Sequence, residues 1–378
     1  MLKRIFVLLV CATLSIYSQE KVNITFRVEA PTLNDSDKVF IVGSIPELGS
    51  WNPGLVELEK ISKGNYRKSF VLNKGIRIEY KFTKGNWQTE ALHDDATIPQ
   101  NSVLVANHDT TVNAVVNNWR DKFNFKIPGQ VTGKVEYHKH FVLYGLKPRD
   151  IIVWLPPDYD KNKNERYPVF YMHDGQNLFD PRTSSMFVDW QMDETADSLI
   201  RKGKIKPIII VGIYNTDDRM AEYADTPLGH LYMKLIVEKI KPFIDSLYRT
   251  LPDRENTAVG GSSMGGLISM MCVWEYPNVF SKAACFSPAF KIEDIDYVKN
   301  VLAYVGKKKE ITLYIDNGGV GLDARLLPGV NEMVKALEEK GFIENKDLFF
   351  FVDKTATHNE AAWAKRVWRP LKIFFGVK

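Results

Sequence analysis

The 378-residue sequence lacks several features that would place it in common classes of protein. Its 50 Lys and Arg residues nearly balance its 46 Asp and Glu residues, for a net charge of +4, and it has no dense basic run. Nucleic acid is therefore not indicated as a partner. Beyond the N-terminal segment the only cysteines are Cys272 and Cys285. We expect two buried free thiols, although a disulfide between them is conceivable. Internal repeats and low-complexity tracts are also missing.

The N-terminus, residues 1–19, has the pattern of an export signal. Lys3-Arg4 precede an apolar stretch that ends near residue 16, and cleavage is expected near residue 19. The stretch is too short to span a bilayer, and no other segment has the pattern of a membrane helix. We therefore expect a periplasmic or secreted protein. A lipid anchor on Cys11 is disfavoured, because Val10 is larger than the small residue that lipoprotein cleavage prefers.

The length of the chain suits two domains, and its pattern changes near residue 120. Residues 20–120 contain short strand-like runs separated by Gly, Asn and Pro turns, which predicts an antiparallel β-sandwich. Residues 121–131 are predicted to form a linker. In residues 132–378, strand-like runs alternate with helical stretches, which is typical of a mostly parallel sheet with flanking helices.

The most informative segment is GSSMGG, residues 261–266. It lies between a strand-like run and a long apolar run. At such a junction G-x-S-x-G is typical of a nucleophile elbow, because the tight turn accepts only small residues two positions before and after the serine. The turn would expose Ser263 Oγ and direct the Met264 N–H toward a substrate oxyanion. Since the same pattern occurs in ordinary loops, the assignment depends on whether the chain supplies partners for the serine.

Partners for Ser263 follow in the order that α/β-hydrolases use, an acid and then a histidine. His358 is the one histidine after the serine, and it lies in a polar stretch behind a predicted strand. Asp316 ends an earlier predicted strand, and Asp323 lies in the glycine-rich loop behind it or at the start of a helix. We favour Asp323 as the acid that orients the imidazole and keep Asp316 as the alternative. Glu360 is a weaker third candidate, being too close to His358 in sequence.

The loop HDGQNLFD, residues 173–180, follows another predicted strand and is expected to supply a second oxyanion donor. Gly175 would let the backbone turn an N–H inward, and Gln176 or Asn177 would provide it.

Three segments together resemble a known family: DGQNLFD in this loop, GSSMGG at the elbow and HNEAAW beginning at His358. Over about residues 130–378 the chain resembles the esterase D-like branch of the α/β-hydrolases, which includes feruloyl, acetylxylan and enterochelin esterases. The resemblance implies substrate contacts from Arg219 and Tyr223. The chain departs from the usual Gly-x-x-Asp/Glu spacing of the family, since Asp323 falls later.

A second resemblance lies in the N-terminal part. The segments VGSIPELGSWNP, residues 42–53, and IEYKF, residues 78–82, resemble the starch-binding domains of amylases and glucoamylases. The resemblance implies that Trp51 and Trp87 stack on sugar rings while Lys81 bonds their hydroxyl groups. The alternative is that the tryptophans only pack a sandwich that positions the enzyme.

These features predict an α/β-hydrolase domain with a smaller N-terminal antiparallel β-sandwich. The expected function is that of an exported serine esterase that cleaves acetyl or feruloyl esters on carbohydrates. Two alternatives stay open: a siderophore esterase similar to enterochelin esterases, and a carbohydrate-binding protein with an inactive hydrolase domain. We expect no cofactor and no metal, since His138 and His140 lack further residues at ligand spacing.

Overall fold

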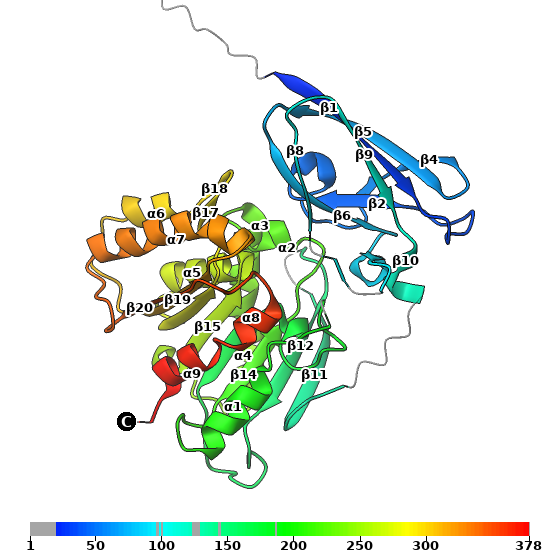
Figure 1. Cartoon of the computed structure of the whole chain (residues 1–378). Helices are drawn as coiled ribbons and strands as arrows, with labels where there is room; N and C mark the ends of the chain where they lie inside the picture. Colours follow the sequence, from blue (N-terminus) through cyan, green and yellow to red (C-terminus); the bar gives the residue numbers. More distant parts are fainter. Residues whose placement is uncertain are drawn as a thin grey trace, which may run out of the picture. The chain divides into compact units, whose positions relative to one another are not determined.

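The computed structural model describes residues 20–95, 98–99, 101–122, 129–142, 145–185 and 187–377. The chain divides into two compact units, Met1–Asn124 and Phe125–Lys378 (Figure 1). The predicted export signal, residues 1–19, and residues 123–128 of the predicted linker lie outside the described residues. No helix among the described residues combines the length and apolar character needed to cross a bilayer.

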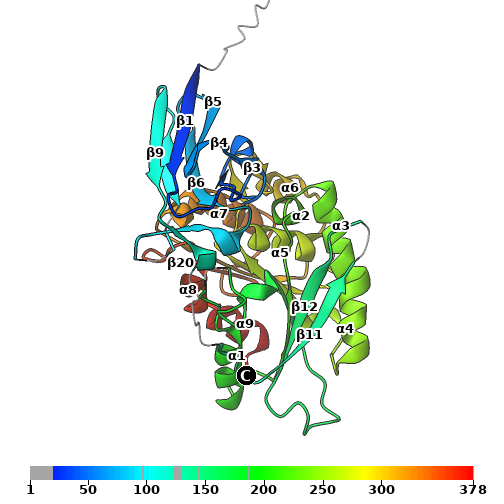
Figure 2. The same cartoon turned by 90° about the vertical axis from the view of Figure 1, so that its right-hand side faces the viewer.

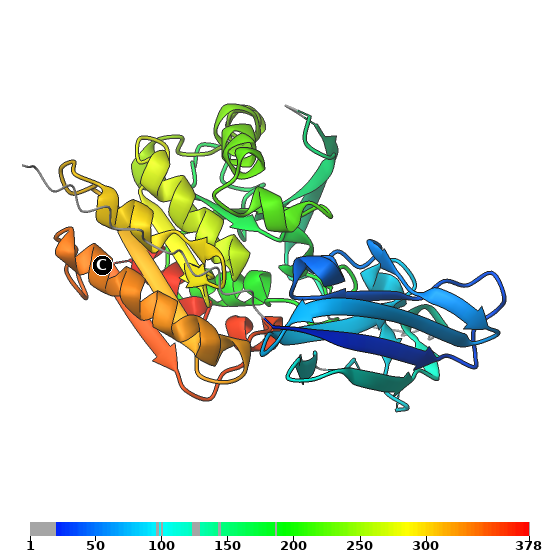
Figure 3. The same ribbon diagram turned by 90° about the horizontal axis from the view of Figure 1, so that it is seen from above.

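The first unit is the predicted β-sandwich, formed by two four-stranded sheets (Figure 3). One sheet has the order β4 (Glu59–Ser62), β5 (Asn65–Asn73), β1 (Lys21–Glu29) and β9 (Thr110–Val115). The other has the order β3 (Val56–Glu57), β2 (Phe40–Gly43), β6 (Arg77–Thr83) and β8 (Ser102–Val105). All of these pairings are antiparallel except β1 with β9, which run parallel. A short pair, β7 (Ala91–Leu92) and β10 (Asn118–Trp119), completes the described strands of this unit.

Alternation of side chains explains why β1 forms one wall of this sandwich. Val22, Ile24, Phe26 and Val28 are buried, and the polar residues between them face outward. Phe26 is fully buried and meets the Phe70, Tyr80 and Phe82 rings edge to face. The two sheets therefore share one aromatic core.

The second unit contains an eight-stranded sheet (Figure 2). Its order is β11 (Lys134–Phe141), β12 (Arg149–Leu155), β14 (Ile209–Ile213), β13 (Val169–His173), β15 (Thr257–Ser262), β16 (Lys282–Phe286), β19 (Thr312–Gly318) and β20 (Leu348–Asp353). The pairings β11–β12 and β12–β14 are antiparallel, and all later ones are parallel. The prediction of a mostly parallel sheet is confirmed.

Helices cover both faces of this sheet, so its central strands β13, β14 and β15 are buried on both sides. On one face Val169 and Tyr171 of β13 pack with residues of α3 (Pro227–Leu235), α4 (Lys241–Leu247), α5 (Met264–Glu275), α6 (Val298–Ala303) and α7 (Leu322–Glu339). On the other face Phe170 and Met172 pack with residues of α1 (Met192–Arg201), α8 (Glu360–Ala364) and α9 (Trp368–Phe375). The described part of this unit also contains α2 (Arg219–Glu222), the π-helix η5 (Ile236–Ile240) and two 3-10 helices, η4 (Gly175–Asn177) and η6 (Arg254–Asn256). A short hairpin, β17 (Lys291–Ile292) with β18 (Ile295–Asp296), lies outside the main sheet.

Candidate active site

Ser263 lies on a sharp turn at the centre of the large sheet, between the end of β15 and the start of α5. Its backbone has φ 58° and ψ −122°, a conformation that non-glycine residues rarely adopt. Close packing requires glycine at positions 261 and 266, whereas a Cβ on Gly265 would meet nothing nearer than Asp174 Oδ2 at 3.4 Å. A Cβ on Gly261 would lie 2.9 Å from the backbone of Gly265, and one on Gly266 would lie 2.9 Å from Pro288 Cβ. The segment therefore has the strained geometry of a nucleophile elbow.

The predicted oxyanion donors follow two neighbouring strands of the sheet, β13 and β15. Met264 is the first residue of α5, and Gln176 lies in a short 3-10 helix, η4 (Gly175–Asn177), directly after β13. Strand β13 pairs with β15, so the two loops emerge from the same edge of the sheet. A Cβ on Gly175 would lie 2.4 Å from the carbonyl carbon of Gly212, which makes glycine obligatory here. Gln176 Oε1 accepts a hydrogen bond of 3.3 Å from the Asn215 backbone N–H.

His358 is hydrogen-bonded to Asp323. Asp323 is the second residue of α7, after β19, and its side chain is fully buried. His358 lies in the loop after β20, its side chain is 15% exposed, and its Nδ1 lies 2.6 Å from Asp323 Oδ1. Asp323 Oδ2 accepts hydrogen bonds from the Gly318 backbone N–H (2.9 Å) and from Ser287 Oγ (3.0 Å). A carboxylate only accepts hydrogen bonds, so Nδ1 carries the proton and Nε2 is left as the basic atom.

Asp316, the alternative acid, is occupied elsewhere. Arg366 binds both of its oxygens, with Nε 2.9 Å from Oδ2 and Nη2 3.1 Å from Oδ1, and Tyr314 Oη donates to Oδ2 at 2.7 Å. Burial raises the pKa of Asp316, and the adjacent Arg366 guanidinium offsets part of that rise. The structure thus pairs the imidazole with Asp323 and gives Asp316 a buried ion pair.

Ser287, which the sequence analysis did not single out, connects these two carboxylates. It follows β16 with φ 41°, donates to Asp323 and accepts hydrogen bonds from Trp363 Nε1 (3.1 Å) and Arg366 Nη2 (3.3 Å). The Trp363 ring also meets the His358 ring edge to face at 5.0 Å. Only the position of Ser287 directly after a parallel strand could have suggested it, since its partners are distant in sequence.

Arg219 forms a bidentate ion pair with Asp174 beside the elbow. Its Nε and Nη2 lie 2.7 and 2.8 Å from the two carboxylate oxygens, and Asn215 Nδ2 donates to Oδ1 at 2.6 Å. Asp174 itself has φ 57°, at the start of η4. Burial disfavours the charged forms of both residues, but each partner outweighs it: Arg219 lowers the pKa of Asp174, and Asp174 raises the pKa of Arg219. Because Asp174 and Gln176 belong to the same loop, the ion pair fixes the position of that loop. The Arg219 side chain is 25% exposed, so part of it faces solvent.

The expected substrate contact from Tyr223 is not supported by the position of its side chain. Its side chain is fully buried, with its ring 5.0 Å from the Arg219 guanidinium carbon, and its hydroxyl accepts a hydrogen bond from the Asp174 N–H at 3.3 Å. Tyr223 therefore packs against the Arg219–Asp174 ion pair. Nearby Glu360 is also buried and accepts a hydrogen bond from Asn177 Nδ2 at 3.3 Å. Burial, followed by the charge of Asp174, raises the pKa of Glu360 to about 7.

In the first unit, the Trp51 and Trp87 rings lie 6.4 Å apart and are inclined by 33°. Both are half-buried, which leaves part of each ring exposed. The expectation that Lys81 bonds sugar hydroxyls is corrected. Its side chain is only 8% exposed, and Nζ pairs with Glu90 Oε2 at 3.0 Å, while Glu90 Oε1 pairs with Arg120. Lys81, in β6, therefore belongs to a buried charge cluster with Glu90 and Arg120.

The serine elbow on a mostly parallel sheet, with helices on both faces, defines the second unit as an α/β-hydrolase. Residues 147–368, more than half of the chain, match the family model described as "Putative esterase", and the chain belongs to that family. Residues 21–115 match the model described as "Starch binding domain". The first unit is thus a starch-binding domain of the CBM20 type.

Three relatives match the chain over different shares of its length. "Uncharacterized protein YbbA" of Bacillus subtilis is 22% identical over 60% of this chain and 93% of its own length. "Endo-1,4-beta-xylanase/feruloyl esterase" of Xylanibacter ruminicola is 29% identical over 50% of this chain and 25% of its own. "Amylopullulanase" of Thermoanaerobacter thermohydrosulfuricus is 32% identical over 26% of this chain and 7% of its own. The chain is therefore similar to small parts of two much longer carbohydrate-related enzymes.

Solved structures share the fold. A structure named "ferulic acid esterase" has a TM-score of 0.54 at 21% identity, over 65% of this chain and 98% of its own. The enterobactin esterase FES of Shigella flexneri has a TM-score of 0.52 at 12% identity, over 95% of this chain and 94% of its own. At these identities the likeness extends to the fold alone.

Proposed function

We propose that this esterase-family member is a serine carboxylic ester hydrolase whose triad is Ser263, His358 and Asp323. The observation that carries the proposal is the 2.6 Å hydrogen bond between His358 Nδ1 and Asp323 Oδ1, in segments that follow β20 and β19, at the sheet edge where the strained Ser263 turn follows β15. Strands β15, β16, β19 and β20 are consecutive in the sheet, so the loops after them share one edge. A serine, a histidine and a buried carboxylate at this edge are the components of an acyl-transfer site.

In the proposed reaction, Ser263 Oγ attacks the ester carbonyl and transfers its proton to His358 Nε2. Asp323 stabilises the imidazolium that forms, and the N–H groups of Met264 and Gln176 bind the oxyanion. The imidazolium then protonates the departing alcohol, which leaves an acyl ester on Ser263. Water, deprotonated by His358, hydrolyses that ester and restores the serine. The reaction needs no cofactor, and none is proposed.

For the substrate we propose acetyl or feruloyl esters on carbohydrates. Support comes from the joining of an esterase-family unit to a starch-binding domain in one chain, since tethering an enzyme to a polymer raises the local concentration of its bonds. The relative from Xylanibacter ruminicola, whose name includes feruloyl esterase, is consistent with this class. In the first unit, Trp51 and Trp87 are proposed to stack on sugar rings. Export to the periplasm or medium, directed by residues 1–19, is part of the proposal because the polymer lies outside the cell.

A single substrate panel tests the proposal. The same enzyme preparation is offered p-nitrophenyl acetate, acetylated xylan, methyl ferulate and ferric enterobactin. We expect turnover of the first and release of acetate or ferulate, without siderophore cleavage. Cleavage of ferric enterobactin alone would replace the carbohydrate class by the siderophore class. If every ester is hydrolysed no faster with the protein than in buffer alone, the esterase proposal is wrong and the alternative of a carbohydrate-binding protein applies.

A further inference from the structure

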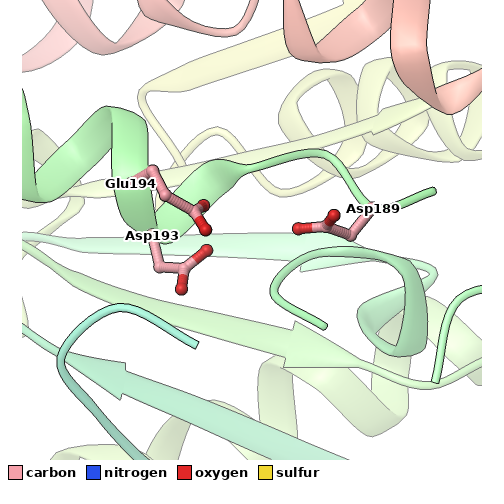
Figure 4. Close-up of side chains that lie close together, drawn as sticks. All are labelled: Asp189, Asp193 and Glu194. Atoms are coloured by element: carbon pink, nitrogen blue, oxygen red, sulfur yellow. The ribbon is translucent and has the colours of Figure 1, made fainter. Parts of the chain in front are cut away.

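Three carboxylates converge on the second unit at a place that the proposed esterase reaction does not use. Asp189 lies in the loop before α1, and Asp193 and Glu194 lie in its first turn. One oxygen atom from each side chain lies within 4.8 Å of the other two. Figure 4 shows that the three carboxyl groups point toward one another.

Lysine or arginine side chains usually neutralise such a cluster of carboxylates by forming ion pairs with them. Among the residues that the structure describes, no lysine or arginine forms an ion pair with any of the three carboxylates. Asp193 Oδ2 accepts the Thr132 N–H at 2.6 Å, Glu194 Oε1 accepts Gln130 Nε2 at 2.6 Å, and Asp189 Oδ2 accepts the Gln191 N–H at 3.1 Å. These donors fix one oxygen of each group but supply no positive charge.

Two further oxygens are buried without a partner. Asp193 has a side chain with no exposed surface, and its Oδ1 has no hydrogen bond. Glu194 Oε2 is likewise buried and without a hydrogen-bond partner. A buried carboxylate oxygen without a donor is costly, so each such atom requires an explanation such as a bound ion.

We propose that Asp189, Asp193 and Glu194 bind a divalent cation of the calcium type. Ca²⁺ prefers carboxylate oxygens at about 2.3–2.6 Å, so two of its ligands on opposite sides are about 5 Å apart. The observed limit of 4.8 Å fits inside that sphere. A cavity of about 220 Å³ next to the cluster, lined by Val188, Asp189, Gln191, Ala361, Ala364 and Lys365, offers a route for the ion and its remaining water ligands.

The proposed cation would fix a loop that supports the catalytic groups. Trp190, between Asp189 and the helix, donates its N–H to the Asn177 carbonyl at 2.9 Å, at the end of η4. Its ring packs 5.4 Å from the Trp363 ring, which itself contacts His358. Binding of the ion therefore stabilises the packing behind both the oxyanion loop and the imidazole, as a structural site and not as a reactant.

The test uses the full chain, stripped with EDTA and then titrated with Ca²⁺ or with Tb³⁺, a luminescent substitute for Ca²⁺. We expect Ca²⁺ to raise Tm by about 5 °C or more at saturation. Tryptophan-sensitised Tb³⁺ luminescence should appear and be displaced by excess Ca²⁺. Asp193→Asn should abolish both effects, and Glu194→Gln serves if that variant fails to fold. Asp197→Asn, which changes an acidic residue paired with Arg201 on the same helix, should retain both effects.

The competing explanation is a proton shared between Asp193 and Glu194. In that case Ca²⁺ leaves Tm unchanged, Tb³⁺ gives no displaceable luminescence, and the EDTA-treated protein equals the untreated one. That result would overturn the proposal. So would a Ca²⁺ response that persists undiminished in Asp193→Asn or Glu194→Gln, because the ion would then bind elsewhere.

Discussion

Asp323 accepts a 2.6 Å hydrogen bond from the imidazole of His358, although 34 residues, including most of α7 and all of β20, separate them in sequence. The contact arises because β19 and β20 are parallel neighbours, which brings the loops at their carboxyl ends together. Asp316 is seven residues earlier and lies within β19, where its oxygens face Arg366 instead. This difference between two nearby aspartates leads to the first prediction.

Asp323→Asn should lower kcat by at least about 10³-fold, because the imidazole loses the charge that orients and stabilises it. Asp316→Asn should retain far more activity but unfold more readily, since it leaves Arg366 buried without a counter-charge, a change that costs about 3–5 kcal/mol. Ester turnover and urea unfolding of both variants provide the comparison. A crippled but stable Asp316→Asn beside an active Asp323→Asn would reverse the assignment.

Ser287→Ala should lower kcat about tenfold and leave KM nearly unchanged. The variant removes one hydrogen bond to the charged Asp323, and such bonds contribute about 1.5–3 kcal/mol, part of which a water can replace. Steady-state kinetics measure the split between kcat and KM. Ser246→Ala is the matched control, because that hydroxyl is exposed and bonds only the Phe243 carbonyl among the described contacts. If Ser287→Ala and Ser246→Ala have the same kcat, the hydrogen bond from Ser287 to Asp323 does not contribute to catalysis.

The buried Glu360 should make stability depend on pH. Burial raises its folded-state pKa from the ordinary value of 4.5 to about 7, so near neutral pH the folded protein holds a proton that the unfolded chain releases. The contribution of protonated Glu360 to the free energy of unfolding is therefore fully present below about pH 4.5 and is lost as the pH rises through 7. The difference corresponds to roughly 3 kcal/mol.

Urea unfolding of wild type and Glu360→Gln at several pH values tests this. Between pH 5 and 8 the wild type should lose stability relative to the variant, which has no proton to release. Parallel curves for the two proteins across this range would show that Glu360 is ionised in the folded state at neutral pH.

Trp51→Ala and Trp87→Ala should each weaken binding of the full chain to a soluble α-glucan by about tenfold, since each removes one stacking surface. Retention in an affinity gel measures the effect. Trp368→Ala, which changes a partly exposed tryptophan of the other unit, is the control and should migrate as wild type does. If the wild-type protein itself migrates unretarded over a range of glucans, the tryptophans only pack the sandwich.

Local patterns in the sequence predicted much of this molecule. The close approach of Gly261 to Gly265 lies within five residues, so a local pattern specifies the elbow. The short strand-like runs and turns of residues 20–120 are also local, and they predicted the sandwich. The parallel pairing of β1 with β9 and the burial of Lys81 against Glu90 were not predictable, since both depend on which distant segments meet. The roles of Ser287 and Arg366 were not predictable for the same reason, because their hydrogen bonds join residues that are 29 to 79 positions apart in sequence.

The central claim is that Ser263 is the nucleophile, and covalent labelling tests it most directly. A fluorophosphonate reacts only with an activated serine, so intact protein should gain one adduct, and peptide mass spectrometry should place that adduct on Ser263. His358→Ala should remain unlabelled under the same conditions because the serine loses its base. An adduct on Ser262 or another serine, or an unlabelled wild-type protein that is correctly folded, would contradict the account.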